Sequence, residues 1–530
     1  MDVEELKYSQ LHALSLAKSG DPEGARELLE RVFQKNQDDP ETAGILGGIY
    51  KTLFHKHEDT ALALLARDTY LQNFNKTQSY YTGINAASMS AMLMQASKSR
   101  ELAKKVLELI SLETEDFWEL ATLGEAFLLI KEKDKALAYF LKSRKIAHAD
   151  WGKMNSVYNQ LWLLNHYLPV PQEIIKLFTP PTVAAFVGHM IDRPDRETSR
   201  FPASLEGEVK MAISGALKSL NARIGYCSLA CGGDILFAEA MDEMGGEVNL
   251  FLPFDEKDFI RESVAFAGES WVNRYYALVK KFPVTYCSQG SFGGCNDLFS
   301  LQSMVIFGSS FLRSLTLRNE PTLVSLLSET DLSRKEGGTR HTLGYWPFPG
   351  KMVNINPDHY LKDFAPSVTG GVKENEIHPP SNCVLVFLLY VTGFPLTLLE
   401  DLDEAVLKGV LNPVVQRKDE GILLGFSNGM ALGDAVQVVK DFFSNQGLKV
   451  RMSLHAGVIP FGSWENLAMD TLPPIQILMR INECGTEGTC LATATVAKVL
   501  ALQLKRFSVH ESGWIGQEEK LEVYSITSNS

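Results

Sequence analysis

The segment Val183-Ala-Ala-Phe-Val-Gly-His189 decides the fold of the middle of this chain. A run of five apolar residues that ends in glycine and a polar side chain is typical of a buried strand that stops at a turn. A helix is predicted over residues 205–220, and Ile224-Gly-Tyr-Cys-Ser228 then repeats the strand pattern. Strands and helices that alternate at this spacing predict a parallel, doubly wound sheet.

The same alternation continues along the chain. A second helix is predicted over residues 234–244, and Val248-Asn-Leu-Phe-Leu-Pro253 has the pattern of a third strand. Ligands bind at the carboxyl ends of the strands in an open parallel sheet, and glycines before a helix let backbone N–H groups approach a phosphate. Residues that could contact a ligand follow all three predicted strands. The predicted ligand-binding residues are Gly188, His189, Arg193, Gly232, Gly233, Asp234, Glu239 and Asp255.

Each of these features also has an ordinary structural explanation. A Gly-Gly pair between a strand and a helix is often only a tight turn, and a lone histidine is more often structural. Arg193 and Arg196 could neutralise phosphates, because guanidinium groups pair well with them, but residues 192–197 could equally form a solvated charged loop. Asp234 could cap the following helix or contact a ribose hydroxyl. The occurrence of such residues at three separate strand ends favours a ligand site.

Three motifs in this region resemble those of the SLOG superfamily of Rossmann-like domains: Phe186-Val-Gly-His189, Gly232-Gly-Asp234 followed by Glu239, and Leu252-Pro-Phe-Asp255. The resemblance implies a domain over residues 180–330 that binds a nucleotide or a nucleotide-derived ligand. Enzymes of the superfamily cleave nucleotide glycosidic bonds and carry a Pro-x-Gly-Gly-x-Gly-Thr-x-x-Glu motif. Here Ala230 replaces the proline, and Ile235 and Leu236 replace the Gly-Thr pair. The resemblance therefore favours ligand sensing over hydrolysis.

Residues 1–170 are predicted to be helical almost throughout, because apolar residues recur at spacings of three and four. Asp21-Pro-Glu23 and Asp39-Pro-Glu41 each place a capping aspartate before a proline at the first helical position. Leu46-Gly-x-x-Tyr50 and Leu123-Gly-x-x-Phe127 then resemble tetratricopeptide (TPR) repeats, in which small residues let paired helices approach. A generic α-solenoid is the alternative. Both predict a concave face that binds a protein partner.

A last α/β unit is predicted over residues 381–530, after a segment over residues 331–380 that is rich in glycine, proline and charge and is interpreted as a linker. The strand that leads to Gly393-Phe394 and the segment Val450-Arg-Met-Ser-Leu-His-Ala-Gly457 resemble the class III adenylate/guanylate cyclase catalytic domain. An unrelated ferredoxin-like sandwich is the alternative. The predicted architecture is therefore multidomain, with a TPR-like α-solenoid, a doubly wound Rossmann-like α/β centre and an α+β, ferredoxin-like, cyclase-type C-terminus.

The cyclase resemblance implies catalytic positions that this chain fills only in part. Active members hold two metal ions with two acids. The first acid falls at Tyr390, and a tyrosine cannot replace a carboxylate as a magnesium ligand. The second falls at Glu420, the transition-state amide at Gln476 and its arginine partner at Arg480. Because loss of a charge-neutralising group slows phosphoryl chemistry by orders of magnitude, the resemblance favours a pseudoenzyme, with Mg²⁺ needed only if the site is active.

Composition narrows the functional class. The net charge of −13 argues against a general nucleic-acid binder, which needs clustered lysines and arginines. The cysteines are odd in number and begin at Cys227, so a secreted disulfide framework is not expected, and no spacing completes a zinc site. The N-terminus is polar and acidic, unlike a signal peptide, and the apolar run over residues 383–391 is too short to cross a membrane. A cytoplasmic protein with no metal, membrane or nucleic-acid partner is predicted.

Together these features predict a regulatory protein that senses a nucleotide-like ligand in its central domain and binds a protein partner through its TPR-like helices. Class III sites form between two domains, so the cyclase resemblance also implies a homodimer. The layout is similar to the TRAFs-binding-type regulatory region of stress-activated apoptosis-signal kinases, although the chain has no kinase motifs. Two enzymatic alternatives remain: a nucleotide cyclase that uses Glu420, Gln476 and Arg480, or a nucleotide hydrolase that uses Asp234 and Glu239. A scaffold without a ligand is a third.

Overall fold

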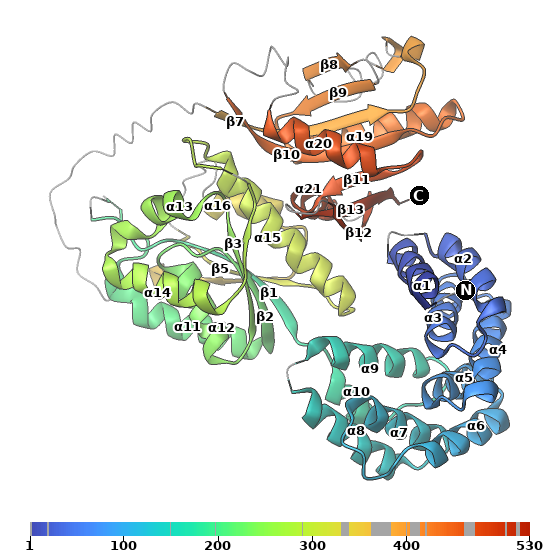
Figure 1. The fold of residues 1–530 in the computed structure, drawn as a ribbon. Helices are drawn as coiled ribbons and strands as arrows, with labels where there is room; N and C mark the ends of the chain where they lie inside the picture. The colour runs from blue at the N-terminus through green and yellow to red at the C-terminus, as the bar shows by residue number, and fades with distance from the viewer. Residues whose placement is uncertain are drawn as a thin grey trace. The chain divides into compact units, whose positions relative to one another are not determined.

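The chain folds into two compact units, residues 1–180 and residues 181–530 (Figure 1). The computed structural model describes residues 3–18, 21–148, 150–194, 196, 198–288, 290–329, 339–361, 383–398, 400–402, 414–418, 421–460, 472–503, 506–515 and 520–529. Each unit has its own hydrophobic core, and each is considered by itself below.

The first unit is a TPR-like array of antiparallel helix pairs. Asp21 and Asp39 cap their helices as the sequence predicts, and Asp116 caps a third: each accepts a hydrogen bond from a backbone N–H of the first turn. The helices are α1 (Val3–Lys18), α2 (Pro22–Lys35), α3 (Pro40–His57), α4 (Thr60–Thr77), α5 (Tyr80–Met92), α6 (Ala96–Leu109), α7 (Phe117–Leu129), α8 (Lys133–Ala147), α9 (Trp151–Leu164) and α10 (Gln172–Phe178).

Small residues let these helices pack closely. A Cβ atom on Gly47 of α3 would lie 2.4 Å from the ring of Tyr70 on α4, and one on Gly124 of α7 would lie 2.9 Å from the ring of Phe140 on α8. Both aromatic rings are almost completely buried. The close approach of paired helices over an aromatic ring confirms the repeat-type packing predicted from the Leu-Gly motifs.

The second unit begins with a six-stranded parallel sheet. Its strands lie in the order β4-β3-β2-β1-β5-β6, so the chain moves outward from β1 to one edge and then returns to the other side of β1. Helices α12 and α15 cover opposite faces of the sheet (Figure 1). The strands are β1 (Thr182–Gly188), β2 (Ala222–Cys227), β3 (Glu247–Leu252), β4 (Val284–Tyr286), β5 (Thr322–Leu326) and β6 (Met352–Ile355).

The helices of this region are α11 (Glu206–Ser219), α12 (Gly233–Glu243), α13 (Glu256–Ser263), α14 (Glu269–Lys281), α15 (Asp297–Thr316), α16 (Thr339–Thr342) and α17 (Asp358–Leu361). Helix α15 is long and apolar enough to cross a membrane by composition, but most of it is buried inside this unit. It packs on β1 and β2 on one side and on α21, defined below, on another.

The structure corrects one predicted boundary. Strand β6 pairs in parallel with β5, from Leu323 opposite Met352 to Leu326 opposite Ile355. Residues 339–361 therefore belong to the parallel-sheet region rather than to a linker over residues 331–380. The remainder of the predicted linker lies outside the described residues.

A seven-stranded mixed sheet follows, in the order β12-β13-β11-β10-β7-β9-β8. Strands β10 and β11 pair in parallel and the other neighbours pair antiparallel. The strands are β7 (Cys383–Thr392), β8 (Val414–Lys418), β9 (Gly421–Phe426), β10 (Arg451–Pro460), β11 (Cys490–Thr493), β12 (Phe507–Ile515) and β13 (Leu521–Ser528), and the main helices are α19 (Gly429–Asn445), α20 (Pro473–Cys484) and α21 (Ala494–Ala501).

Candidate functional site

The carboxyl ends of β1, β2 and β5 meet at His189. Its ring Nε2 accepts a hydrogen bond of 3.0 Å from the backbone N–H of Ser328, just beyond β5. Its carbonyl oxygen accepts one of 3.1 Å from the N–H of Gly233, the first residue of α12. Since His189 is only 3% exposed, its ring is a structural tie between strand ends and is not presented to solvent.

The glycines at the start of α12 allow this backbone to lie close to the segment that follows β1. Gly232 has φ of +101° and forms an isolated bridge with Met190, and a Cβ atom there would lie 2.6 Å from the backbone nitrogen of Ile191. The N–H groups of Gly233 and Ile235 bond to the carbonyl oxygens of His189 and Ala230. In this structure protein carbonyl oxygens therefore occupy two of the N–H groups at the helix start that the sequence predicts could approach a phosphate.

The segment after β1 covers this helix start, and we call residues 190–194 and 198–201 the roof segment. The carboxylate of Asp192 accepts backbone hydrogen bonds from Arg200 and Phe201, each of 2.9 Å, which closes the segment on itself. The guanidinium of Arg193 lies 4.0 Å from the ring centre of Phe266 and donates to the carbonyl oxygen of Glu262 at 3.0 Å. Arg193 therefore holds the roof segment against the end of α13.

Beneath the roof segment lies a buried polar chain. Asp234 is 7% exposed, and its Oδ2 accepts a hydrogen bond of 3.3 Å from the N–H of Ala230. Its carboxylate accepts another from the hydroxyl of Ser228. Gln302 of α15 donates to the hydroxyl oxygen of Ser228 at 2.8 Å and to the carbonyl oxygen of Phe251 at 2.5 Å. Burial raises the pKa of Asp234 to about 7, and the hydrogen bonds only partly oppose this effect.

Two other predicted residues lie at the same edge in structural roles. Gly188 ends β1, where a Cβ atom would lie 2.8 Å from the ring of Phe186. Asp255 caps α13 by accepting a hydrogen bond of 3.0 Å from the N–H of Asp258, and its own N–H bonds to Gly290. Neither residue contacts Asp234 through a hydrogen bond.

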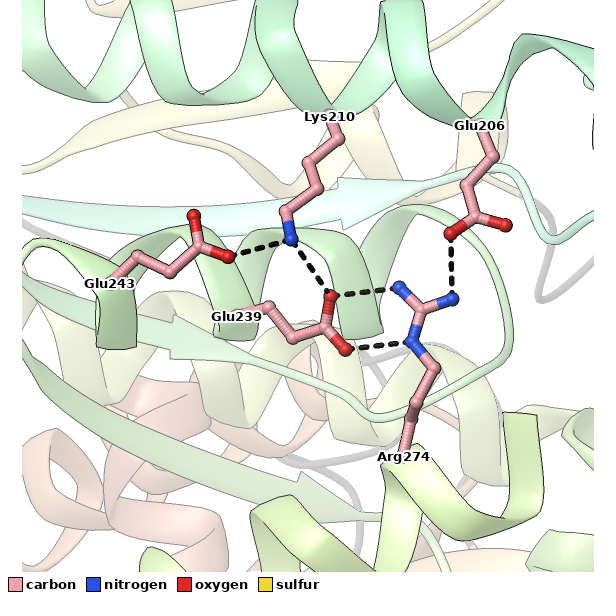
Figure 2. A network of polar contacts seen from close by, with 5 residues as sticks. All are labelled: Glu206, Lys210, Glu239, Glu243 and Arg274. Carbon is pink, nitrogen blue, oxygen red and sulfur yellow. Dashed lines mark hydrogen bonds and ion pairs between the residues drawn. The ribbon is translucent and has the colours of Figure 1, made fainter. Parts of the chain in front are cut away.

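Glu239 lies elsewhere, in an ion-pair network that joins α11, α12 and α14 (Figure 2). Arg274 donates to both of its carboxylate oxygens at 2.7 Å, and a third nitrogen of the same guanidinium contacts Glu206 at 2.7 Å. Lys210 lies 3.5 Å from Glu239 and 2.6 Å from Glu243.

Asp234 and Glu239, which the hydrolase alternative would use together, point in different directions from α12. Five residues of α-helix separate the two side chains by about 140° around the helix axis. One carboxylate points beneath the roof segment, and the other is neutralised by two cations on a different face of α12. The structure therefore does not bring the two carboxylates together as a hydrolase would require.

The cyclase-like positions divide into three groups. Tyr390 is 7% exposed and lies in an apolar cluster with Leu423, Ile475 and Leu478. Gln476 and Arg480 lie on the exposed side of α20, four residues apart and therefore on the same face. Glu420 lies outside the described residues. Among the residues that the structure does describe, no three His, Cys, Asp or Glu side chains gather as a metal site would need.

Gln302 and Ser328 are site residues that no motif in the sequence indicates. Gln302 is a single amide inside the apolar helix α15, and a lone polar residue on a buried helix face is a weak but usable signal. Ser328 contributes only a backbone N–H, which no side-chain pattern reveals.

Residues 2–90 match a family model described as Tetratricopeptide Repeats-Sensor. Together with the helix pairs described above, this match identifies the first unit as TPR-like. TPR-type repeats point to protein–protein interaction and a regulatory role.

Solved structures give only distant likenesses. MamA is 18% identical, with a TM-score of 0.21 over 34% of this chain and 91% of that chain. The adenylyl cyclase CyaB from P. aeruginosa is 12% identical, with a TM-score of 0.21 over 28% of this chain and 96% of that chain. An adenylate/guanylate cyclase/hydrolase from Silicibacter pomeroyi is 11% identical, with a TM-score of 0.23 over 28% and 99%. Likenesses this low do not bear on function. No curated protein matches the chain.

Proposed function

We propose that this chain is a cytoplasmic regulatory protein whose TPR-like unit binds a protein partner and whose Rossmann-like parallel sheet senses a nucleotide-like ligand. The main support for ligand binding is the buried Asp234, which is linked through Ser228 to Gln302. These residues lie where the strand order reverses at β1. Ligands of parallel sheets bind at such reversals, and a buried acid with a raised pKa is common at binding sites.

Ligand entry in this proposal requires the roof segment to move. Its release would free the guanidinium of Arg193, which now donates to the carbonyl oxygen of Glu262, for an anionic oxygen of the ligand. Asp234 would then accept from a ribose hydroxyl or from a base N–H. Binding and a change of shape are thereby coupled, as a sensor needs.

We further propose that the ferredoxin-like, cyclase-type domain is an inactive homodimerisation module. Its support is the apolar cluster around Tyr390, where an active relative would hold a metal ion with a carboxylate. The odd number of cysteines in the sequence suits a reducing cytoplasm. The alternative, an active cyclase, draws on the shared exposed face of Gln476 and Arg480. Cyclic product formed from ATP or GTP with Mn²⁺, and lost in Glu420→Ala, would establish that alternative.

Thermal unfolding of the full chain with nucleoside mono-, di- and triphosphates tests the sensing proposal. A ligand at about 100 times its Kd stabilises the folded state by roughly 2.7 kcal/mol. We expect at least one nucleotide to raise the melting temperature of the wild type, and Asp234→Asn to remove that rise. Glu243→Gln is the matched control, because it removes a carboxylate from the exposed side of the same helix. If no nucleotide stabilises the wild type, the sensing proposal is wrong.

A further inference from the structure

Four polar side chains meet on the inner side of the first unit, one from each of α3, α5, α7 and α9. These helices line the inner side of the arc in Figure 1. The residues are Lys51, Ser88, Glu125 and Gln160, and we call them the polar floor. Ser88 and Glu125 are 37 residues apart, and Glu125 and Gln160 are 35 apart. They therefore occupy equivalent positions in successive helix pairs.

One carboxamide ties the polar floor together. Lys51 donates from Nζ to Oε1 of Gln160 at 3.0 Å, and Nε2 of Gln160 donates to Oε1 of Glu125 at 2.6 Å. The hydroxyl of Ser88 donates to that same carboxylate oxygen. An amide suits this place because it is neutral and both accepts from an ammonium group and donates to a carboxylate.

The polar floor has hydrogen-bonding capacity left over. An ammonium group carries three N–H donors, and within the described part of the chain Lys51 has one hydrogen-bond acceptor, Gln160. The bonds from Ser88 and Gln160 both end on Oε1 of Glu125, which leaves Oε2 available among the residues that the structure describes. Burial lowers the pKa of Lys51 and raises the pKa of Glu125, so each charge is poorly solvated although both side chains are only half-buried.

Two exposed aromatic side chains lie about two helical turns from the polar floor, at the same end of their helices. Tyr81 lies seven residues before Ser88 on α5, and Trp118 lies seven residues before Glu125 on α7. Seven residues are about two helical turns, so each aromatic ring lies on the same helix face as its polar partner. Tyr81 is 42% and Trp118 46% exposed. Exposed tyrosine and tryptophan beside desolvated polar groups are typical of the anchoring residues of protein interfaces.

We propose that this inner face binds a partner peptide that presents an asparagine or glutamine side chain to the polar floor. The proposal rests on the proposed function of the TPR-like unit as a partner-binding module. The carbonyl oxygen of the peptide amide accepts from Lys51, and its NH₂ group donates to Oε2 of Glu125, as Gln160 already does on Oε1. Apolar residues next to that amide pack against Tyr81 and Trp118. The floor carries one positive and one negative group, so charged peptide side chains fit less well.

Selection from a random peptide library displayed on phage tests this inference on the full chain. We expect wild-type protein to enrich peptides in which Asn or Gln is flanked by apolar residues. A synthetic peptide made from an enriched sequence should bind at least about tenfold more weakly when its amide residue is replaced by Leu. The same loss is expected with Lys51→Met or with Trp118→Ala in the protein.

Two controls separate recognition from misfolding. Lys104→Met removes an exposed lysine from α6 and should leave the affinity unchanged. Trp118 is on the surface, so Trp118→Ala tests the inner face even if Lys51→Met proves unstable. Enrichment of acidic or basic peptides, or affinities that none of these changes alters, would overturn the inference while leaving partner binding intact. Failure to enrich any peptide would count against both.

Discussion

At the scale of single residues, Asp234 makes stability depend on pH. Its pKa is raised from 3.8 to about 7 in the folded protein, so folding favours the protonated acid. This preference stabilises the folded state fully below about pH 4, and the stabilisation is lost as the pH rises toward 7. A pKa raised from 3.8 to about 7 corresponds to at most roughly 4 kcal/mol of stability.

We therefore expect Asp234→Asn to flatten the fall in the free energy of unfolding between about pH 4 and pH 7. Chemical denaturation at several pH values measures this directly. Glu243→Gln, on the exposed side of α12, should keep the wild-type slope. An unchanged slope in Asp234→Asn would show that this carboxyl titrates normally.

The residues that gather at the sheet edge could be predicted, because strand ends and the glycines after them are visible in the sequence. Their hydrogen-bond partners could not. Gly233 bonds to a carbonyl oxygen 44 positions earlier in the chain, that of His189, and Glu239 pairs with Arg274 of another helix. Local spacing indicates which face of a helix a residue occupies, but it does not indicate which distant group bonds to that residue. The sequence therefore could not show that carbonyl oxygens of the same chain occupy the N–H groups at the start of α12.

At the scale of elements, one glycine sets the distance between α15 and α21. A Cβ atom on Gly308 would lie 2.0 Å from the carbonyl oxygen of Lys498, a contact that real structures do not contain. Backbone oxygen cannot move as a flexible side chain can, so the two helices must separate. We expect Gly308→Ala to lower the free energy of unfolding by about 1–3 kcal/mol.

Gly215 offers the matched control for that change. It also lies in a helix, α11, and a Cβ atom there would meet nothing within 4 Å. Gly215→Ala should therefore raise stability by roughly 0.5–1 kcal/mol through helix propensity alone. Equal effects of the two substitutions in urea unfolding would contradict the tight helix contact.

Helices and strands that have a clear local sequence pattern could be predicted well, and elements without such a pattern could not. Aspartate caps, Leu-Gly motifs and five-residue apolar runs located α2, α3, β1 and β3 to within a few residues. Strand β6 has four residues, of which only Ile355 is buried, and its place in the sheet depends on pairing with β5. A four-residue edge strand is too short to show the alternation of apolar and polar residues that distinguishes a strand from a loop.

At the scale of the whole molecule, separate hydrophobic cores in residues 1–180 and 181–530 predict separate unfolding transitions. We expect calorimetry of the full chain to resolve two transitions that respond to different changes. A peptide that binds the polar floor should raise only the transition of the first unit, and a nucleotide should raise only that of the second.

Gly308→Ala assigns the transitions. It should lower the transition of the second unit by roughly 2 °C for each kcal/mol lost and leave the other unchanged, because Gly308 belongs to the core of residues 181–530. A single transition that every ligand and variant shifts together would mean that the units unfold as one cooperative body. In that case ligand binding at the parallel sheet and partner binding at the inner helical face would be thermodynamically coupled, since each would stabilise the same folded state.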